Sequence, residues 1–238
     1  MIGKRPSKEM YRDRVYLLAL HFITESKDLI GGIMLINTVD TAASMCEKLL
    51  EDMPSYIRLD TCQNMLCFDK EKSSAGGVVI TFLGVDGNID LQKEIDDFFQ
   101  PITKFCVSIN CNCSREVVTK PTNHIVVELL SIPKGFRASG KYSHLENTTK
   151  ISQNYAGKVL LKLGDISKTI TINGDVYNLR GVIAFDGSAR ELRQSYGHYT
   201  AYGLRSNDQW QCYDDLKDQV STKSKTFKVN AEILFYTK

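Results

Sequence analysis

Two segments near the C-terminus decide the fold: Gly197-His198-Tyr199-Thr200-Ala201-Tyr202, and Trp210 followed by Tyr213-Asp214-Asp215. Both are expected to be strands, because turn-forming residues 206–208 separate them. If the two strands pair, Asp214 lies opposite Thr200, on the same face as His198 and diagonal to it. A shift of one residue in the register would bring Asp215 to that face instead.

A histidine beside a carboxylate has two interpretations. The functional one is a general base, because a carboxylate on one ring nitrogen fixes the tautomer that leaves the other nitrogen able to accept a proton. The plain one is that His198 is an ordinary strand residue and that Asp214 and Asp215 form a solvated turn. On these two strands alone, the plain interpretation is favoured.

The composition is that of a globular protein. The chain has 238 residues, 42% of them hydrophobic, which fits one large domain. Thirty Lys and Arg against 28 Asp and Glu give a net charge of +2 without a long basic run, so we expect no nucleic-acid partner. The longest apolar run near the N-terminus, residues 15–23, is too short to cross a bilayer, and we expect no membrane partner.

Seven cysteines are present, an odd number without the dense spacing of a disulfide-rich domain. We therefore expect reduced thiols and a cytoplasmic or nuclear protein. Cys106, Cys111, Cys113 and His124 could supply four zinc ligands, but the first two gaps are four residues and one residue. Structural zinc sites usually present two pairs with two to four intervening residues each. We favour free thiols, and predict no metal and no other cofactor.

The order of the elements predicts an α+β protein. Helices are expected over residues 8–23, from Thr41 toward Pro54, and over about 90–99 before Pro101. The first half therefore looks helical, whereas strands dominate after residue 124. They are expected at 125–130, 159–163, 168–172, 177–185, 198–205, 210–213 and 231–236. Helices followed by an antiparallel sheet form an α+β layout.

Several motifs together resemble the histidine box of the ubiquitin-specific proteases. They are Tyr177-x-Leu179-x-Gly181-Val182-Ile183, Gly187, Gly197 to Tyr202, Trp210-x-x-Tyr213-Asp214-Asp215 and Ile233-Leu234-Phe235-Tyr236. Upstream, Gln92-x-x-x-x-Asp97-Phe98-Phe99 is similar to a Q-x-D-A-x-E-F-L helix of that family, and residues 106–113 resemble a remnant of its zinc-bearing fingers. The resemblance covers roughly residues 33–238.

This resemblance implies a papain-like fold with an N-terminal helical thumb and a C-terminal antiparallel β palm. The fingers are expected to be truncated and to lack a second cysteine pair. Residues 1–30 are then an N-terminal helical extension, and residues 31–238 form the catalytic-type domain.

The resemblance also locates the expected nucleophile, and no cysteine stands there. The family pattern L-x-N-x-G-N-T-C-Y-x-N-S aligns without a gap on Leu35 to Cys46. Alanine occupies the cysteine position, Ala42, and three neighbours also depart from the pattern, namely Val39, Asp40 and Ala43. Because a methyl group cannot attack a carbonyl, we predict a pseudoenzyme.

The family's other site residues are carried over onto matching positions. His198 and Asp214 are the remaining members of the catalytic group, and Asn37 matches a position that helps to stabilise the oxyanion. The resemblance further implies that Gly197, Tyr199 and Asp97 contact the ubiquitin tail.

Two other cysteines are alternative nucleophiles. Cys46 lies on the same helical face as Ala42 but one turn away, about 5–6 Å between β-carbons, which is too far for a site that needs accurate placement. Cys62, in Asp60-Thr61-Cys62-Gln63-Asn64, is similar to N-T-C-Y-x-N, but no apolar helix follows it. Neither is favoured, and whether the chain is an enzyme stays open.

Three functions are compatible with the sequence. The first is a domain that binds ubiquitin or a ubiquitin-like tail without cleaving it, and the second is an active cysteine-type deubiquitinase with a non-standard thiol. The third is a scaffold for unrelated partners. Two departures weaken ubiquitin binding, since Phe185 stands where the family often has a histidine and Glu232 replaces an aromatic residue.

Overall fold

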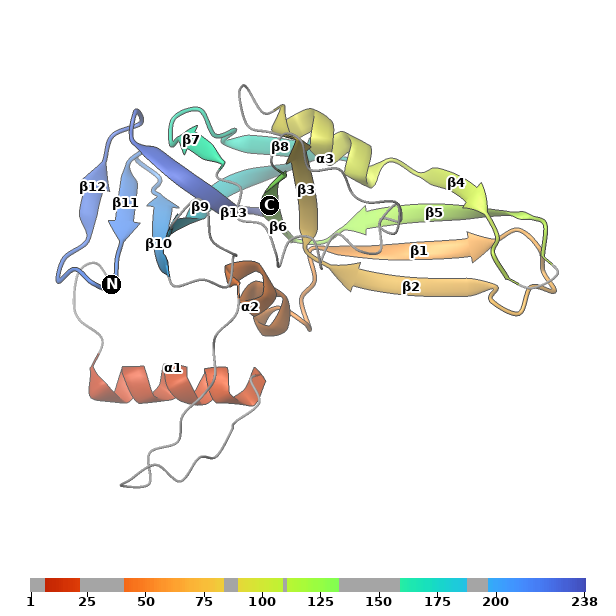
Figure 1. Ribbon diagram of the computed structural model, residues 1–238, viewed down its shortest axis with the longest axis horizontal. Coiled ribbons are helices and arrows are strands. Elements are labelled where there is room, and N and C mark those ends of the chain that lie inside the picture. The colour runs from red at the N-terminus through yellow and green to blue at the C-terminus, as the bar shows by residue number, and fades with distance from the viewer. Residues whose placement is uncertain (1–6, 22–40, 84–89, 109–110, 133–158, 188–196) are drawn as a thin grey trace.

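The computed structural model describes residues 7–21, 41–83, 90–108, 111–132, 159–187 and 197–238. Within them, the chain forms a large mixed sheet, a smaller four-stranded sheet that extends away from it, and helices on either side of the large sheet (Figure 1). The predicted α+β class is confirmed.

The large sheet has nine strands, and its main path runs β12-β11-β10-β9-β13-β6-β3, with β7 beside β13 and β8 beside β9. In chain order these strands are β3 (Val78–Leu83), β6 (His124–Ile132), β7 (Leu160–Lys162), β8 (Thr169–Ile172), β9 (Asp175–Gly187), β10 (Gly197–Leu204), β11 (Trp210–Tyr213), β12 (Ser221–Lys223) and β13 (Lys228–Thr237). Every strand predicted after residue 124 is present, and β12 was not predicted. The sheet is antiparallel except for β3 and β6, which pair in parallel.

One face of the large sheet carries the main core. Helix α3 (Leu91–Phe99) is capped by the Asp90 side chain, which accepts a hydrogen bond from the Lys93 amide, so the helix begins where the sequence predicts. Its buried residues Leu91, Ile95 and Phe99 repeat every four positions and join the core cluster. Strand residues such as Trp210 and Tyr177 are fully buried in the same cluster.

The opposite face carries helix α2 (Ala42–Leu49). Thr41 caps it by accepting a hydrogen bond from the Ser44 amide, as predicted. Ala42 packs against Val126 and Ile233, whose chain neighbours point into the main core. Because side chains alternate along a strand, α2 and α3 lie on opposite faces of the sheet, and Figure 1 shows them well separated.

The smaller sheet was not predicted. It has the strand order β2-β1-β5-β4, with every pair antiparallel: β1 (Tyr56–Cys62), β2 (Glu71–Gly76), β4 (Ile102–Phe105) and β5 (Ser114–Pro121). The expectation of a helical first half is therefore wrong. Its edge strands β2 and β4 are exposed along almost their whole length, so they lack the alternation that marks a half-buried strand.

Helix α1 (Lys8–His21) confirms the helix predicted near the N-terminus. The expected domain boundary after residue 30 lies outside the described residues, as does Asn37. Among the described helices, none combines the length and the apolar character that crossing a bilayer requires.

Candidate functional site

The β10–β11 hairpin has the predicted register. Ala201 pairs with Tyr213, and continuing this ladder by one step places Asp214 opposite Thr200. The His198 Nε2 atom lies 2.8 Å from Asp214 Oδ1, so the predicted side-chain pair forms. Asp215 is more distant, with its Oδ1 atom 3.5 Å from the same nitrogen.

Several contacts hold the Asp214 carboxylate in its ionised form. Lys217 Nζ lies 3.0 Å from Oδ2, and the Leu216 amide donates to Oδ1 at 3.1 Å. Lys217 first, and His198 second, lower the pKa of Asp214 to about 2. A permanent carboxylate at Nε2 orients the imidazole and leaves Nδ1 for a second partner, which is the arrangement that a general base requires.

Ala42 contacts the strand that carries His198. Its backbone amide at the N-terminus of α2 donates to the Tyr199 hydroxyl over 3.4 Å, and Tyr199 directly follows His198 on β10. Ala42 therefore contacts Tyr199, whose side chain alternates with that of His198 along β10. The position is well suited to a thiolate, because a helix N-terminus carries partial positive charge. The side chain found there is a buried methyl group.

The seven cysteines all lie in the described part of the chain, where the side-chain partners of His198 are the carboxylates of Asp214 and Asp215. Cys46 is disfavoured as a nucleophile, because burial and the nearby carboxylates of Glu128 and Glu232 raise the pKa of its thiol to about 11. Cys212 is buried in the main core. Cys62 belongs to a separate cysteine cluster in the smaller sheet.

Gly197 was predicted to contact a ubiquitin tail, and the structure gives this glycine a second role. A Cβ atom at Gly197 would lie only 2.0 Å from Phe185 Cζ, so the phenyl ring rests directly on the backbone of residue 197. The same ring packs on Tyr199, with ring centroids 4.9 Å apart. Phe185 thus covers the glycine that the sequence predicts as a tail contact.

Asp97, the third residue predicted to contact the tail, is not brought to this site. It is exposed on α3, on the face of the sheet opposite to α2. Gln92, in the same motif, exchanges hydrogen bonds of 2.8 and 2.9 Å with the backbone of Thr171. The motif that suggested a tail contact therefore joins α3 to β8.

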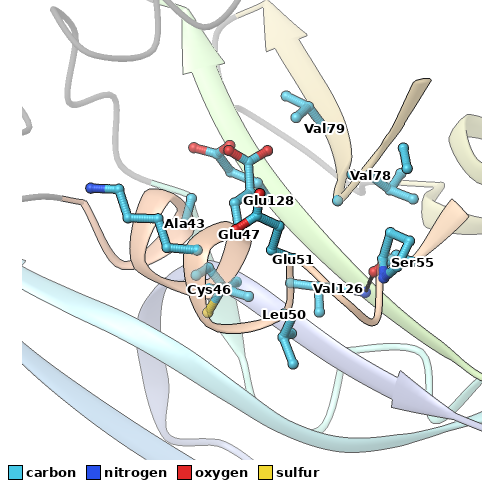
Figure 2. A pocket seen from close by; sticks show the side chains of 16 residues that line it. Ala43, Cys46, Glu47, Leu50, Glu51, Ser55, Val78, Val79, Val126 and Glu128 are labelled. Carbon is cyan, nitrogen blue, oxygen red and sulfur yellow. Dashed lines mark hydrogen bonds between the residues drawn. The ribbon is translucent and has the colours of Figure 1, made fainter. Parts of the chain in front are cut away.

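A cavity of about 440 Å³ lies beside α2, lined by Ala43, Cys46, Glu47 and Lys48 together with residues of β3 and β6. Its apolar lining includes Leu50, Val78 and Val126. Figure 2 shows Glu47, Glu51 and Glu128 around the same space, so carboxylates border an apolar floor. Sequence patterns did not indicate this cavity, because its lining comes from segments distant along the chain.

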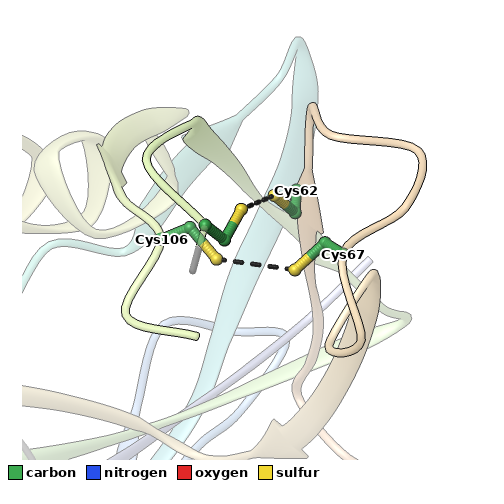
Figure 3. A group of neighbouring side chains, drawn as sticks. Cys62, Cys67 and Cys106 are labelled. Atoms are coloured by element: carbon green, nitrogen blue, oxygen red, sulfur yellow. Dashed lines mark hydrogen bonds between the residues drawn. The ribbon is translucent and has the colours of Figure 1, made fainter. Parts of the chain in front are cut away.

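Four buried cysteines meet at the far end of the smaller sheet: Cys62, Cys67, Cys106 and Cys111 (Figure 3). Their sulfur atoms lie within 4.8 Å of one another, and the shortest separations are 3.5 Å for Cys62–Cys111 and 3.7 Å for Cys67–Cys106. Cys62 ends β1 and Cys67 lies in the loop that follows it, whereas Cys106 and Cys111 lie in the loop after β4. We call this group the cysteine centre.

The cysteine centre corrects two expectations. A second cysteine pair is present, contrary to expectation, and the group that assembles contains Cys62 and Cys67 in place of Cys113 and His124. These four residues fit zinc: tetrahedral Zn–S bonds of about 2.3 Å place sulfur atoms about 3.8 Å apart. The preference for free thiols and no metal is therefore not supported. Bound zinc would join the two loops as a structural crosslink.

The fold and the first site together define a ubiquitin-protease-like domain of the thiol-protease type, with an imidazole–carboxylate pair at the β10–β11 hairpin. The family model described as ubiquitin carboxyl-terminal hydrolase matches residues 36–236. The chain belongs to this family. A comparison with curated proteins returned no match.

Solved structures are similar to this chain at low identity. The Ubp8–Sgf11–Sgf73–Sus1 SAGA DUB module matches with a TM-score of 0.40 and 18% identity, over 77% of this chain and 39% of the other. A Ubp8 module bound to monoubiquitin gives 0.39 and 19%, over 84% and 44%. The Saccharomyces cerevisiae Pan2 pseudoubiquitin hydrolase–RNA exonuclease module gives 0.40 and 11%, over 80% and 33%. The chain thus spans less than half the length of each of these matched chains.

Proposed function

We propose that this chain is a catalytically inactive ubiquitin-protease-like domain that binds ubiquitin, or a ubiquitin-like tail, without cleaving it. One observation carries the proposal: the His198–Asp214 pair forms with a 2.8 Å contact, whereas Ala42, matched to the nucleophile position, is the first residue of the helix that contacts the neighbouring Tyr199. The imidazole and carboxylate that would assist the reaction are present, and a methyl group replaces the attacking sulfur atom.

Inactivity follows from the chemistry of acyl transfer. Cleavage of an isopeptide bond in a thiol protease needs a thiolate that attacks the carbonyl carbon and forms an acyl-enzyme. His198 can only polarise water in this site, and a triad without its nucleophile retains roughly 10³–10⁴-fold catalysis over the uncatalysed reaction. The pKa of about 11 for Cys46 makes its thiolate scarce at neutral pH.

Binding of ubiquitin is supported by the family membership and by the retained geometry around β10. The domain of residues 31–238 and an extension of residues 1–30 are part of the proposal, as is a reducing compartment, cytoplasm or nucleus, in which free thiols are stable. The Phe185 ring lies against Gly197 and hinders close contact between this glycine and a ubiquitin tail. We therefore expect weak binding.

The test combines binding and cleavage in one preparation of the full chain. Titration of isotope-labelled ubiquitin should shift resonances of its C-terminal residues, while a ubiquitin conjugate carrying a fluorescent leaving group should remain intact. Ala42→Ser is the matched variant, since it changes the site by one oxygen atom and should leave binding unchanged. Cleavage by the wild-type chain would contradict inactivity, and absence of shifts at millimolar concentration would favour the scaffold hypothesis.

A further inference from the structure

Arg115, the second residue of β5, is a buried charge beside the cysteine centre. Only 4% of its side chain is exposed. Taking a guanidinium out of water costs several kcal/mol unless its charge and its N–H groups are matched by partners. The identity of those partners therefore indicates what the residue does.

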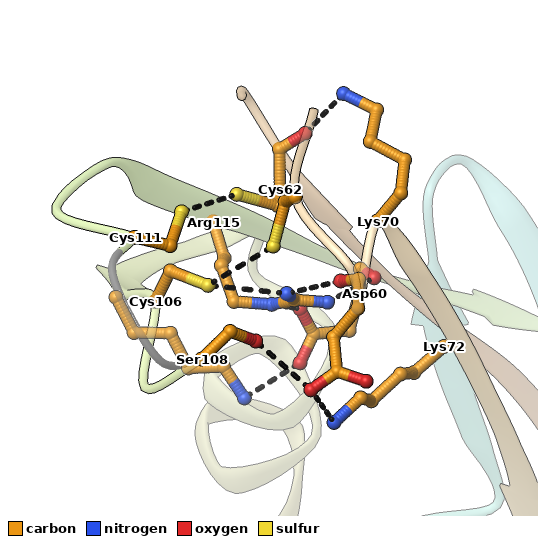
Figure 4. Close-up of polar contacts among 11 residues, drawn as sticks. Asp60, Cys62, Lys70, Lys72, Cys106, Ser108, Cys111 and Arg115 are labelled. Carbon is orange, nitrogen blue, oxygen red and sulfur yellow. Dashed lines mark hydrogen bonds and ion pairs between the residues drawn. The ribbon is translucent and has the colours of Figure 1, made fainter. Parts of the chain in front are cut away.

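The guanidinium joins the elements that build the cysteine centre (Figure 4). Its Nε atom donates to the Asp60 carboxylate on β1, and Nη2 donates to the Asp60 carbonyl oxygen at 2.9 Å. Its Nη1 atom donates to the Asp69 carbonyl oxygen at 2.6 Å, in the segment that follows Cys67. The same Nη1 atom lies 3.5 Å from Cys106 Sγ, in the other loop.

Arg115 shares its carboxylate partner with a second cation. Asp60 is shared with Lys104, whose Nζ lies 2.7 Å from Oδ2, so two cations meet one carboxylate and the group carries one surplus positive charge. The neighbouring Asp69 carboxylate is paired with Lys72 at 3.0 Å. The surplus charge faces a sulfur atom, and a zinc ion held by four thiolates carries a net charge of −2.

We propose that Arg115 is a positioning residue of the cysteine centre, which fixes Cys106 in the geometry of a metal ligand and neutralises part of the charge of a zinc–tetrathiolate complex. Residues that hydrogen-bond to a metal ligand without touching the metal orient that ligand and tune the affinity for the metal. Arg115 suits this role better than lysine, because its rigid fork of donors reaches the sulfur and the carboxylate at once.

The experiment measures metal binding in the full chain. Zinc affinity is obtained by competition with a chromophoric chelator, and the absorption bands of the cobalt-loaded protein report tetrahedral thiolate coordination. We expect Arg115→Met to bind zinc about 10–100-fold more weakly, with altered cobalt bands, and Arg115→Lys to show an intermediate loss. Arg58→Met is the matched control, because Arg58 lies in the same sheet and donates to Thr119 at 2.9 Å. It should bind zinc like the wild type.

A second readout separates positioning from a general effect on folding. If Arg115 acts through the metal ligands, Arg115→Met lowers the unfolding midpoint more in zinc-loaded protein than in metal-free protein. Equal losses in the two forms, or unchanged zinc affinity and cobalt bands, would overturn the proposal, as would a wild-type chain that binds neither metal. If Arg115→Met does not fold, the zinc affinity of Arg115→Lys tests the proposal, since this variant keeps the positive charge and loses the planar set of guanidinium donors.

Discussion

The site around His198 and the cysteine centre differ in the groups that they contain. At His198 the imidazole and its carboxylate are in contact, and residue 42, at the N-terminus of α2, supplies no sulfur. At the cysteine centre four sulfur atoms converge, and a buried arginine contacts one of them. The two sites therefore differ in whether sulfur atoms are present: residue 42 is an alanine, whereas four cysteines meet in the smaller sheet.

The largest expected effect is at the cysteine centre. Cys67→Ser removes one of four metal ligands, and because a structural zinc site contributes directly to folding, zinc binding should be lost. A loss of several kcal/mol corresponds to a fall in the unfolding midpoint on the order of 10 °C for a chain of this size. Calorimetry with and without chelator, together with zinc content, measures both.

Cys113→Ser provides the matched control for that experiment. Cys113 packs against the cysteine centre without belonging to its four closest sulfur atoms. The variant should retain zinc and most of its stability. If both serine variants lose zinc equally, the four cysteines of the centre are not the ligand set.

A smaller, pH-dependent effect is expected at Asp214. Its folded-state pKa of about 2 lies below the usual value of about 3.9. The carboxylate therefore stabilises the fold above about pH 4, and this contribution is lost as the pH falls toward 2. Asp214→Asn should be less stable than the wild type at pH 7, and the difference in the free energy of unfolding should shrink across that interval.

Denaturant unfolding at several pH values measures this difference. Asp215→Asn is the control, because 84% of the Asp215 side chain is exposed and its carboxylate is 3.5 Å from the imidazole. It should change stability little at any pH. A constant difference for Asp214→Asn between pH 7 and 2 would show that the carboxylate does not act through its charge.

A modest effect on binding is expected from Phe185→His. Phe185 covers Gly197, so a tail can reach the glycine only in conformations in which the ring has moved away. A smaller and more polar ring should populate such conformations more often, and the affinity for ubiquitin should rise about five-fold. Ubiquitin lacking its last two glycines is the control ligand. An equal gain in affinity for that ligand would show that the effect does not involve the ubiquitin tail.

The smallest effect is expected from Cys46→Ser. The thiol of Cys46 is half-buried, with a pKa of about 11, and it should alkylate slowly at neutral pH. The serine variant should therefore match the wild type in ubiquitin binding and in its lack of cleavage. A change in either measurement would show that Cys46 takes part in the site.

The sequence predicted the histidine site well because its parts are close along the chain. A short turn and strict alternation fix the hairpin register, so the pairing of His198 with Asp214 could be worked out from strand geometry. The Thr41 cap also marked the start of α2 from local residues alone. Ala42 was placed beside this pair only through the resemblance to a family.

The cysteine centre was missed because its ligands are brought together by strand pairing over long distances. Cys62 and Cys111 are 49 residues apart, and Cys67 and Cys106 are 39 apart. The usable signal was the equal spacing within each pair, four intervening residues from Cys62 to Cys67 and from Cys106 to Cys111. Strands β2 and β4, which adjoin the two loops that carry the pairs, are exposed and have no periodic pattern.

The most direct test of the central claim is reaction with ubiquitin that carries a thiol-reactive vinyl group at its C-terminus, followed by intact-mass measurement. The wild-type chain, whose seven cysteines are in no disulfide, should form no adduct, whereas Ala42→Cys should form one that requires His198. An adduct on the wild-type chain, mapped to any cysteine and abolished by His198→Ala, would contradict the vacant nucleophile position.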